Sequence, residues 1–272
     1  EIKAEAAEEA AALKAKGITP CLAVVLVGDD SASQVYVNNK KKACEAVGIR
    51  SVSHVLSGGT TEEALLELIA KLNADQDIHG ILVQMPVPKQ IDERKVILAI
   101  DPKKDVDCFH PVNVGNLHTG GEGFLPCTPA GIIELIKRSG HSIEGKQCVV
   151  IGRSNIVGKP VAMLLMQENG TVTICHSRTR NLAEICRGAD IIVSAVGKVN
   201  TVTADMVKEG AILIDVGMNR NEAGKLCGDV DFENVKEIAG AITPVPGGVG
   251  PMTIAMLMKN CNTAAKIQNG LE

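Results

Sequence analysis

Apolar runs alternate with amphipathic segments along the chain, and this alternation predicts parallel β-sheets whose strands are connected by helices. Cys21–Val27 is a continuous apolar run closed by Gly28, which is typical of a strand buried on both faces of a sheet. Further strands are expected at Ser51–Leu56 and Gly80–Gln84, with a helix at Thr60–Leu72 between them. The first half of the chain is therefore expected to form βαβ units.

The second half repeats this alternation after Pro126. Thr128 is expected to cap a helix that starts with Pro129 and continues to about Arg138. Further strands are expected at Gln147–Ile151, Thr171–Cys175, Asp190–Ala195 and Ala211–Val216. A last helix is expected from about Thr253 to Ile267. This pattern predicts a doubly wound α/β unit.

Local signals mark the starts of several helices. Two capping boxes, in which serine or threonine is followed three residues later by glutamate or glutamine, are expected for Ser31 with Gln34 and for Thr60 with Glu63. The last helix follows a run rich in proline and glycine, Thr243–Pro251. We expect a rigid loop there, because proline restricts φ and glycine lets the backbone approach a ligand closely; a plain linker is the alternative.

Composition limits the classes of protein to which this chain can belong. Of its 272 residues, 45% are hydrophobic and 22% are charged, as in globular proteins. The net charge is −4 and no basic stretch is interleaved with aromatic residues, so we expect no nucleic-acid partner. No apolar run reaches the roughly 18 residues of a membrane-spanning helix, so we expect no membrane partner. A small molecule is the favoured partner.

The cysteines and histidines restrict the chemistry further. Nine scattered cysteines, odd in number and without Cys-x-x-Cys spacing, predict free thiols and a cytoplasmic location. The six histidines form no His-Glu-x-x-His or Cys/His pattern, so no metal is expected. The chain starts inside a helical pattern at Glu1, and we expect that residues precede it in the complete protein.

The only tyrosine, Tyr36, lies four residues before Lys40. On a helix these positions share a face, so an aromatic ring and an ammonium group would project into one cleft. The ring can stack on a planar ligand while the lysine handles protons. The alternative is a half-buried anchor beside a solvated run, Lys40–Lys42, and for this pair alone that alternative is favoured, so other motifs must support a site.

Two polar residues are candidates for the same site. Gln84 ends an apolar strand and so places an amide at the carboxyl end of a strand, where open α/β sheets bind ligands. Asp107, in the run Lys104–Asp107, could accept a pair of N–H donors from an aminopyrimidine-like ring. The alternatives for this carboxylate are turn formation and a surface ion pair.

Glycines at a strand-to-helix turn, Gly152–Gly158, indicate a nucleotide site. Free backbone amides and the helix dipole favour a phosphate there, although the spacing is not the usual Gly-x-Gly-x-x-Gly, and an ordinary turn is the alternative. The next strand ends with Ser177 and Arg178, where an NAD-binding unit normally carries an acid. With Arg153, these residues could hold the extra phosphate of NADP, or they could be polar residues at a solvated strand end.

Six motifs, in order along nearly the whole chain, resemble the bifunctional methylenetetrahydrofolate dehydrogenase/methenyltetrahydrofolate cyclohydrolase family: Tyr36–Lys40, Gly80–Pro86, Lys104–Asp107, Pro126–Pro129, Gly152–Ser154 and Pro246–Thr253. The resemblance implies oxidation of 5,10-methylenetetrahydrofolate by NADP, then hydrolysis of the methenyl product to 10-formyltetrahydrofolate in the same cleft. Tetrahydrofolate one-carbon derivatives would be the substrates. The resemblance also implies a homodimer formed through the cofactor domain.

The resemblance assigns roles to individual residues. Lys40 matches the catalytic lysine, Gln84 the glutamine that positions it, Asp107 the carboxylate that binds the pterin, and Tyr36 the ring that stacks on the folate, and these are the expected catalytic residues. The expected substrate-binding residues are Tyr36, Lys40, Val83, Gln84, Met85, Asp107, Pro246, Gly247, Gly248, Val249, Gly250, Pro251 and Thr253. The expected cofactor-binding residues are Gly152, Arg153, Ser154, Ser177 and Met218.

Two α/β domains with a cleft between them are therefore expected. A folate-binding catalytic domain comprises residues 1–127 and is completed by the C-terminal helix at 253–272. A Rossmann-type, doubly wound NADP-binding domain comprises residues 128–252. Cys108 departs from the family pattern, because many members have glycine there, and its side chain could shift Asp107.

Three other functions share part of this pattern. A short-chain dehydrogenase also uses Tyr-x-x-x-Lys, but its glycine-rich turn precedes that pair, whereas Gly152 follows it. A shikimate-dehydrogenase-like reductase has the same domain order but does not account for Gln84 or for the loop around Gly247. A folate- or nucleotide-binding protein without turnover would be expected to lack Lys40 or Gln84, and both are present.

Overall fold

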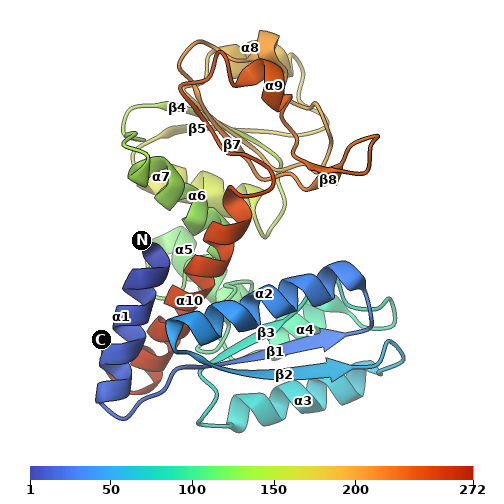
Figure 1. The fold of residues 1–272 in the computed structure, drawn as a ribbon, viewed down its shortest axis with the longest axis vertical. Helices are drawn as coiled ribbons and strands as arrows, with labels where there is room; N and C mark the ends of the chain where they lie inside the picture. Colours follow the sequence, from blue (N-terminus) through green and yellow to red (C-terminus); the bar gives the residue numbers. More distant parts are fainter. Residues whose placement is uncertain (272) are drawn as a thin grey trace. The chain divides into compact units, whose positions relative to one another are not determined.

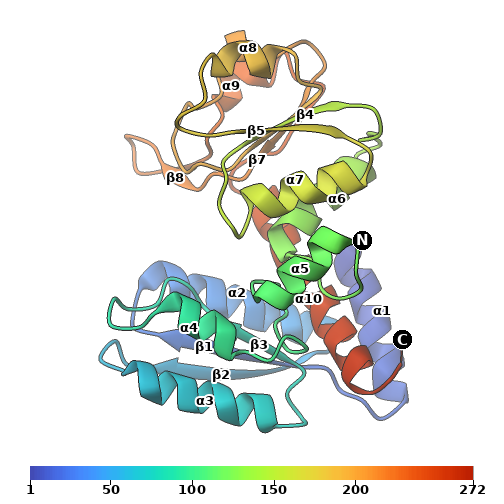
Figure 2. The same cartoon turned by 180° about the vertical axis from the view of Figure 1, so that it is seen from behind.

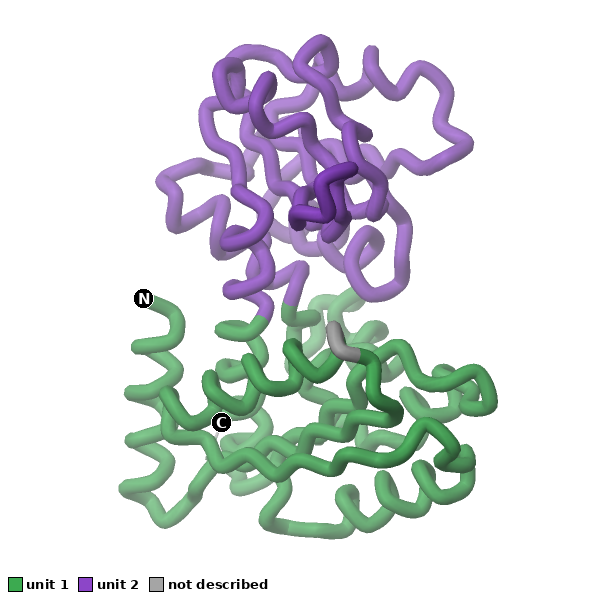
Figure 3. Tube along the Cα trace, turned by 45° about the vertical axis from the view of Figure 1, so that its right-hand side comes forward, with its two compact units in different colours: residues 1–127, 254–272 green, residues 128–253 purple. Residues whose placement is uncertain are grey.

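The computed structural model describes residues 1–271, apart from the side chains of Ser31 and Ala32, and it consists of two compact units (Figure 1). Unit 1 comprises Glu1–Cys127 together with the chain from Ile254 onward, and unit 2 comprises Thr128–Thr253 (Figure 3). Each unit contains its own parallel sheet and its own hydrophobic core.

Unit 1 is built from helices and strands that alternate along the chain. They are α1 (Ile2–Ala15), β1 (Cys21–Val27), α2 (Ser31–Val47), β2 (Arg50–Leu56), α3 (Glu62–Ala74), β3 (Gly80–Val83), α4 (Glu93–Ala99), α5 (Pro111–Thr119) and most of α10 (Val249–Gln268). The strands pair in the order β2-β1-β3, and both pairings are parallel. The β1 strand is therefore the central strand of this sheet.

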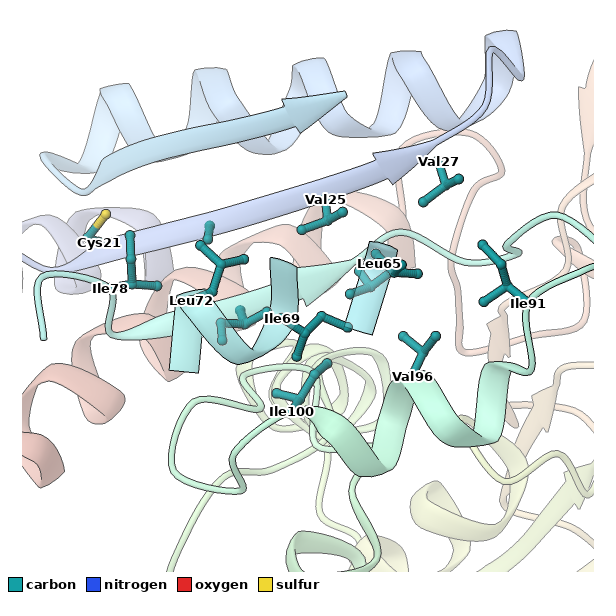
Figure 4. Packing of buried hydrophobic residues seen from close by; sticks show 13 residues of the cluster. Cys21, Val25, Val27, Leu65, Ile69, Leu72, Ile78, Ile91, Val96 and Ile100 are labelled. Carbon is teal, nitrogen blue, oxygen red and sulfur yellow. The ribbon is translucent and has the colours of Figure 1, made fainter. Parts of the chain in front are cut away.

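Central position explains why β1 is apolar throughout. Successive side chains of a strand point to opposite faces, and Val25 and Val27 point to the face that packs against Leu65 and Ile69 of α3 and Val96 of α4 (Figure 4). Figure 2 shows α3 and α4 on this side of the sheet, whereas α2 lies on the other side. Both faces are covered, so every residue of β1 is buried.

Unit 2 contains a five-stranded parallel sheet and several short elements. They are α6 (Cys127–Arg138), β4 (Gln147–Ile151), α7 (Gly158–Gln167), β5 (Thr171–Cys175), α8 (Leu182–Arg187), β6 (Ile191–Ser194), η1 (Ala204–Met206), β7 (Ile212–Asp215), β8 (Asn219–Arg220), β9 (Leu226–Cys227), α9 (Phe232–Val235) and β10 (Ala241–Ile242). The sheet order is β10-β7-β6-β4-β5, and β8 and β9 form a separate antiparallel pair. The predicted α/β fold with a doubly wound unit is confirmed.

Each strand predicted from the sequence is present, with ends that shift by at most one residue. The predicted helix caps are less accurate. Thr61, not Thr60, is the N-cap of α3: its hydroxyl accepts the Ala64 N–H at 3.2 Å, while the Thr60 N–H donates to the Ser57 carbonyl in the preceding turn. The capping signal was correct in kind but wrong by one residue.

The start of α2 differs in the same way. Its N-cap is Asp30, whose side chain accepts the Ser33 N–H at 2.8 Å, so Ser31 is the first helical residue rather than the cap. The side chain of Ser31, on which the predicted capping box with Gln34 depends, lies outside the described residues. Neighbouring Asp and Ser residues are both good caps, and the sequence cannot rank them.

Two helices start earlier than predicted. Helix α6 begins at Cys127, so Thr128 is a helical residue and its hydroxyl pairs with that of Thr253 at 2.9 Å instead of capping the helix. Helix α10 begins at Val249, four residues before the predicted start. Pro251 therefore belongs to the first turn of a helix, where proline is tolerated, and not to a loop.

Candidate functional site

Both sheets change their direction of winding beside a central strand. In unit 1, β1 lies between β2 and β3, and in unit 2, β4 lies between β5 and β6. Open α/β sheets bind ligands outside the carboxyl ends of the strands at such a switch point. The residues that follow β1, β3, β4 and β6 therefore occupy the expected binding positions.

Gln84 follows β3 and holds Lys40 of α2. The Gln84 backbone N–H donates to the Val25 carbonyl at 2.8 Å, so pairing with β1 continues to this residue. Lys40 Nζ donates to Gln84 Oε1 at 2.9 Å, and Gln84 Nε2 donates to the Met85 carbonyl at 2.8 Å. The second bond orients the amide so that its oxygen faces the ammonium group, which can only donate.

Tyr36 lies one helical turn before Lys40 on α2 and is half-buried. Burial raises the pKa of its hydroxyl, so Tyr36 is neutral at physiological pH. Lys40 is also half-buried, whereas Lys41 and Lys42 are exposed. Within this run of lysines, Lys40 is the one with a partner at the end of β3.

Asp107 approaches Lys40 from a segment that runs beside β3. The Ile81 N–H donates to the Lys104 carbonyl at 2.8 Å, and the segment continues in parallel toward the carboxyl end of the strand. Burial raises the pKa of Asp107, and the positive charge of Lys40 opposes this rise. The two charges are close enough to interact, so the structure brings Lys40, Gln84 and Asp107 together.

Two charged neighbours of Asp107 have structural contacts. Lys104 is buried, and its Nζ donates to the carbonyls of Leu72 and Asp75 at 3.1 and 2.6 Å. Asp105 is also buried, and its Oδ2 accepts the His110 N–H at 2.8 Å near the start of α5. These bonds fix the backbone on the amino side of Asp107.

Cys108 adopts the backbone conformation that glycine accepts most readily. Its φ is +61°, in the left-handed region, and its buried Sγ donates to the Phe124 carbonyl at 3.1 Å. A non-glycine residue pays a steric cost there. The cysteine nevertheless retains a turn of the kind that glycine favours directly after Asp107.

Asn260, on α10, is a site-supporting residue that sequence reasoning missed. Its Nδ2 donates to the carbonyls of Val106 and Leu125, both at 2.8 Å. Cys127 Sγ donates to the same Val106 carbonyl at 3.3 Å. Both contacts support the residue before Asp107. A single asparagine inside a helical pattern has no motif, so no sequence signal could have identified it.

In unit 2, Gly152 and Gly158 shape the turn between β4 and α7. Gly152 has a φ of +125°, and a Cβ at this position would collide with the Ala195 carbonyl oxygen. A Cβ on Gly158 would collide with the Gly152 carbonyl oxygen, while Ser154 Oγ accepts the Gly158 N–H at 3.2 Å at the start of α7. Only glycine fits at both positions, and Ser154 Oγ also accepts the Val157 N–H at 3.2 Å, so the turn is fixed from within. A turn that is free of side chains at its two glycines fits the close backbone approach that a dinucleotide phosphate needs.

The two turns with candidate phosphate-binding residues leave the sheet side by side. Ile151 of β4 pairs with Cys175 of β5, so the segments that follow them start at the same sheet edge. Arg153 lies in the first segment and Ser177 in the second, and both are exposed. The N–H of Arg178 donates to Nδ1 of His176 at 3.1 Å, which tightens the second turn.

The remaining predicted residues of unit 2 lie at two other positions. Met218 follows β7 and is 53% exposed. The Pro246–Thr253 segment begins in a turn, with Gly247 at a φ of +111° and the Gly248 N–H donating to the Pro244 carbonyl at 2.9 Å, and it continues as the first turn of α10.

The described residues include no group of three or more His, Cys, Asp or Glu side chains that could hold a metal ion. Within residues 1–271, no helix is long and apolar enough to cross a membrane. All nine cysteines are free thiols, as predicted, and only Cys227 is partly accessible.

Two family profiles match most of the chain. The profile described as tetrahydrofolate dehydrogenase/cyclohydrolase, catalytic domain, matches residues 1–107. The profile described as tetrahydrofolate dehydrogenase/cyclohydrolase, NAD(P)-binding domain, matches residues 126–269.

Similar proteins span almost the same length. A protein of Acetivibrio thermocellus named bifunctional protein FolD is 62% identical over 267 residues, which cover 98% of this chain and 94% of that protein. The crystal structure of the Campylobacter jejuni bifunctional enzyme FolD, a methylenetetrahydrofolate dehydrogenase/cyclohydrolase, is 53% identical with a TM-score of 0.95 and covers 98% of this chain and 95% of that one. The crystal structure of the Trypanosoma brucei FolD, complexed with NADP cofactor and inhibitor, is 43% identical with a TM-score of 0.92. The match covers 98% of this chain and 94% of that one. The chain therefore belongs to the tetrahydrofolate dehydrogenase/cyclohydrolase family.

Proposed function

We propose that this protein oxidises 5,10-methylenetetrahydrofolate with NADP and then hydrolyses the 5,10-methenyl product to 10-formyltetrahydrofolate. The observation that carries this proposal is the 2.9 Å hydrogen bond from Lys40 Nζ to Gln84 Oε1, with Asp107 close enough to Lys40 for their charges to interact. Family membership supports it, since relatives at 62% and 53% identity are named as bifunctional FolD proteins.

The two units have separate roles in this proposal. Unit 1 provides the proton-handling part of the folate site, because Lys40, Gln84 and Asp107 all belong to it, whereas the proposed folate-binding segment Pro246–Thr253 belongs to unit 2. Unit 2 binds NADP, because it contains the turn with Gly152 and Gly158. The family profiles follow the same order, although the NAD(P)-binding profile extends through α10 to residue 269.

The folate is held by groups of matching chemistry. The Tyr36 ring stacks on the planar pterin, and the Asp107 carboxylate accepts a pair of N–H donors from its aminopyrimidine edge. The other substrate-binding residues that we propose are Val83, Met85, Pro246, Gly247, Gly248, Val249, Gly250, Pro251 and Thr253.

The reacting carbon lies between two folate nitrogens, N5 and N10. The chemistry that NADP supplies is acceptance of a hydride from this carbon, which leaves an amidinium cation. Water then adds to the carbon and loses one proton, which leaves a neutral carbinolamine. As the bond to N5 breaks, N5 gains a proton and the hydroxyl loses its proton to become the formyl carbonyl. Two protons leave the water oxygen and one is taken up by N5, so one proton is released in net. Lys40 moves these protons and Gln84 holds its side chain in reach, a role worth about 10²- to 10⁴-fold in rate for a positioned acid–base group.

The cofactor is held mainly by backbone groups. Gly152 and Ser154 would lie at the pyrophosphate: Gly152 leaves room for the backbone to approach it closely, and Ser154 Oγ holds the turn by accepting the Val157 and Gly158 N–H groups. Arg153 and Ser177 bind the additional phosphate of NADP, since guanidinium pairs well with phosphate and the end of β5 carries no acid for the ribose hydroxyls. Met218 contacts the cofactor through its backbone.

We also propose a homodimer formed through unit 2. The β5 strand is at the edge of its sheet, and edge strands offer backbone groups for pairing with a second chain. Ile174 of β5 and Met166 of α7 are 42% and 52% exposed, which supplies apolar surface beside this edge. The nine free thiols support a reducing location such as the cytoplasm.

The alternatives are not favoured. A shikimate-dehydrogenase-like reductase does not account for family profiles that match both halves of the chain. A binding protein without turnover does not account for the hydrogen bond between Lys40 and Gln84.

The first test mixes the purified protein with 5,10-methylenetetrahydrofolate and either NADP or NAD. We expect NADP reduction with little accumulation of the methenyl intermediate, measured optically in one cuvette. Persistent methenyl accumulation would remove the cyclohydrolase activity from the proposal. No reduction of either cofactor would favour the alternative of a folate- or nucleotide-binding protein without turnover.

Lys40→Met should lower the rate of methenyl hydrolysis by about 10²-fold or more, because the positioned proton carrier is lost. Folate binding, measured by calorimetry, should survive, since Tyr36 and Asp107 remain. Lys41→Met is the matched control, because this neighbouring lysine is exposed, and its hydrolysis rate should equal that of the wild type. Unaltered hydrolysis in Lys40→Met would refute the role of Lys40.

Arg153→Ala should weaken NADP binding by roughly tenfold or more while leaving NAD binding nearly unchanged, because only NADP has the phosphate for a charge-assisted hydrogen bond. The dissociation constants of both cofactors are the measurement. Arg187→Ala is the control. Arg187 is an arginine of the same unit, but it lies on α8 and pairs with Asp205 of η1, so both dissociation constants should stay unchanged. Equal losses for NADP and NAD in Arg153→Ala would show that Arg153 does not read the phosphate.

Ile174→Glu should convert the dimer to a monomer, because a buried unpaired carboxylate is costly at an interface. Light scattering coupled to size exclusion measures the mass. Val55→Glu is the control, since Val55 is 66% exposed on β2, the edge strand of the other unit. A monomeric wild type, or an Ile174→Glu variant that stays dimeric, would contradict the proposed interface.

A further inference from the structure

Unit 2 contains two buried carboxylates to which the proposed function assigns no role. Asp215 ends β7 and is 2% exposed, and Asp229, shortly after β9, is 0% exposed. A buried carboxylate is costly unless hydrogen bonds replace its hydration. The donors that these two carboxylates bind therefore indicate what they stabilise.

Asp229 binds three successive backbone N–H groups of the segment after β6. Its Oδ2 accepts from Val196 at 2.8 Å and from Gly197 at 3.3 Å, and its Oδ1 accepts from Lys198 at 2.9 Å. These three residues are exposed, although their N–H groups point to a fully buried carboxylate. Asp229 thus fixes the backbone of the exposed segment 196–198.

The same carboxylates hold both neighbours of Met218. Asn219 Nδ2 donates to Asp229 Oδ1 at 2.9 Å and to the Gly228 carbonyl at 3.0 Å. The Gly217 N–H donates to Asp215 Oδ1 at 3.0 Å. Met218, which lies between these two anchored residues, is therefore held from both sides.

Asp215 joins the two carboxylates into one unit. Its Oδ1 accepts the Asp229 N–H at 2.8 Å, and its Oδ2 accepts the Val230 N–H at 2.9 Å. Glycines make the close approach possible, because a Cβ on Gly217 would collide with the Asp229 carboxylate and a Cβ on Gly228 with the Asp215 carboxylate. The neighbouring sequence is thus adapted to this pair.

The anchored segments adjoin the nucleotide turn. Segment 196–198 directly follows Ala195. The Ala195 carbonyl oxygen lies so close to Gly152 that a Cβ on Gly152 would collide with it. Strands β4 and β6 are paired, with Ile151 opposite Ser194, so this segment and the turn at Gly152 leave the sheet at the same edge. The carboxylates therefore act beside the switch point of unit 2.

We propose that Asp229 and Asp215 are positioning residues that order segments 196–198 and 217–219 for NADP before it binds. This inference rests on the proposed function of unit 2. A segment that is already ordered does not lose conformational entropy when the cofactor binds, so the pair raises NADP affinity without touching the ligand. Proton transfer at the folate takes place on unit 1 residues and does not need this pair.

Two variants of the full-length chain separate positioning from simple stabilisation. Asn219→Ala removes a donor to Asp229 that holds the segment at Met218. Ser194→Ala is the matched control, because Ser194 Oγ also donates to Asp229, at 3.1 Å, but Ser194 is held independently by the β6 pairings. Asp229→Asn is the stronger variant, since an amide has one acceptor oxygen for the donors that Asp229 now binds.

Isothermal titration calorimetry with NADP is the main measurement, with methenyltetrahydrofolate hydrolysis in the absence of NADP as the internal reference. We expect the NADP dissociation constant to rise about tenfold in Asn219→Ala and at least as much in Asp229→Asn, and to stay within about twofold in Ser194→Ala. Hydrolysis should proceed at the wild-type rate in all three variants.

Equal NADP affinity in Asn219→Ala and Ser194→Ala would overturn the inference. A parallel loss of hydrolysis and NADP binding in Asn219→Ala or Asp229→Asn would also overturn it, because such a loss indicates a merely structural role. If Asp229→Asn does not fold, the comparison of Asn219→Ala with Ser194→Ala decides. A wild-type protein that does not bind NADP would overturn the proposed function and this inference together, whereas wild-type binding with unaffected variants would overturn the inference alone.

Discussion

The parallel pairing of β3 with β1 is the constraint on which the unit 1 site depends. It pairs Val83 with Val25 and brings Gln84, the next residue, to the carboxyl end of the central strand. From this position the Gln84 amide accepts from Lys40, which α2 carries back over the sheet after leaving β1. A shift of one residue in this register would turn Gln84 to the other face and leave Lys40 without its partner. The hydrogen bond between Lys40 and Gln84 therefore depends on the observed register of β3 against β1.

The candidate sites of the two units are built from different chemical groups. In unit 1, side chains at strand and helix positions form the candidate site, and Asn260 and Cys127 brace the backbone before Asp107. In unit 2, the candidate site consists mainly of backbone groups, and contacts from outside the site hold that backbone in place. Gly152 and Gly158 let neighbouring backbone segments pack closely. The buried carboxylates of Asp229 and Asp215 bind the N–H groups of the segments beside this turn.

Elements with strong local signals were predicted well. The strands are recognisable because both faces of a parallel sheet are covered, so each central strand is an uninterrupted apolar run. Helix starts were displaced, at Thr61, Asp30 and Cys127, because several neighbouring residues can serve as caps and packing selects one of them. The short helices α4 and α5 were not predicted, since seven and nine residues give too little periodicity.

The sequence by itself determined the alternation of strands and helices, the resemblance that identifies the family, and the positions of Tyr36, Lys40, Gln84 and Asp107 along the chain. These features are local, because they depend on residue type and spacing within one segment. Only the tertiary structure decided which of these residues meet, since Lys40 and Gln84 are 44 positions apart in the chain. It alone revealed the roles of Asp215, Asp229 and Asn260, because a single carboxylate or amide has no motif until folding brings its hydrogen-bond donors and acceptors from distant segments.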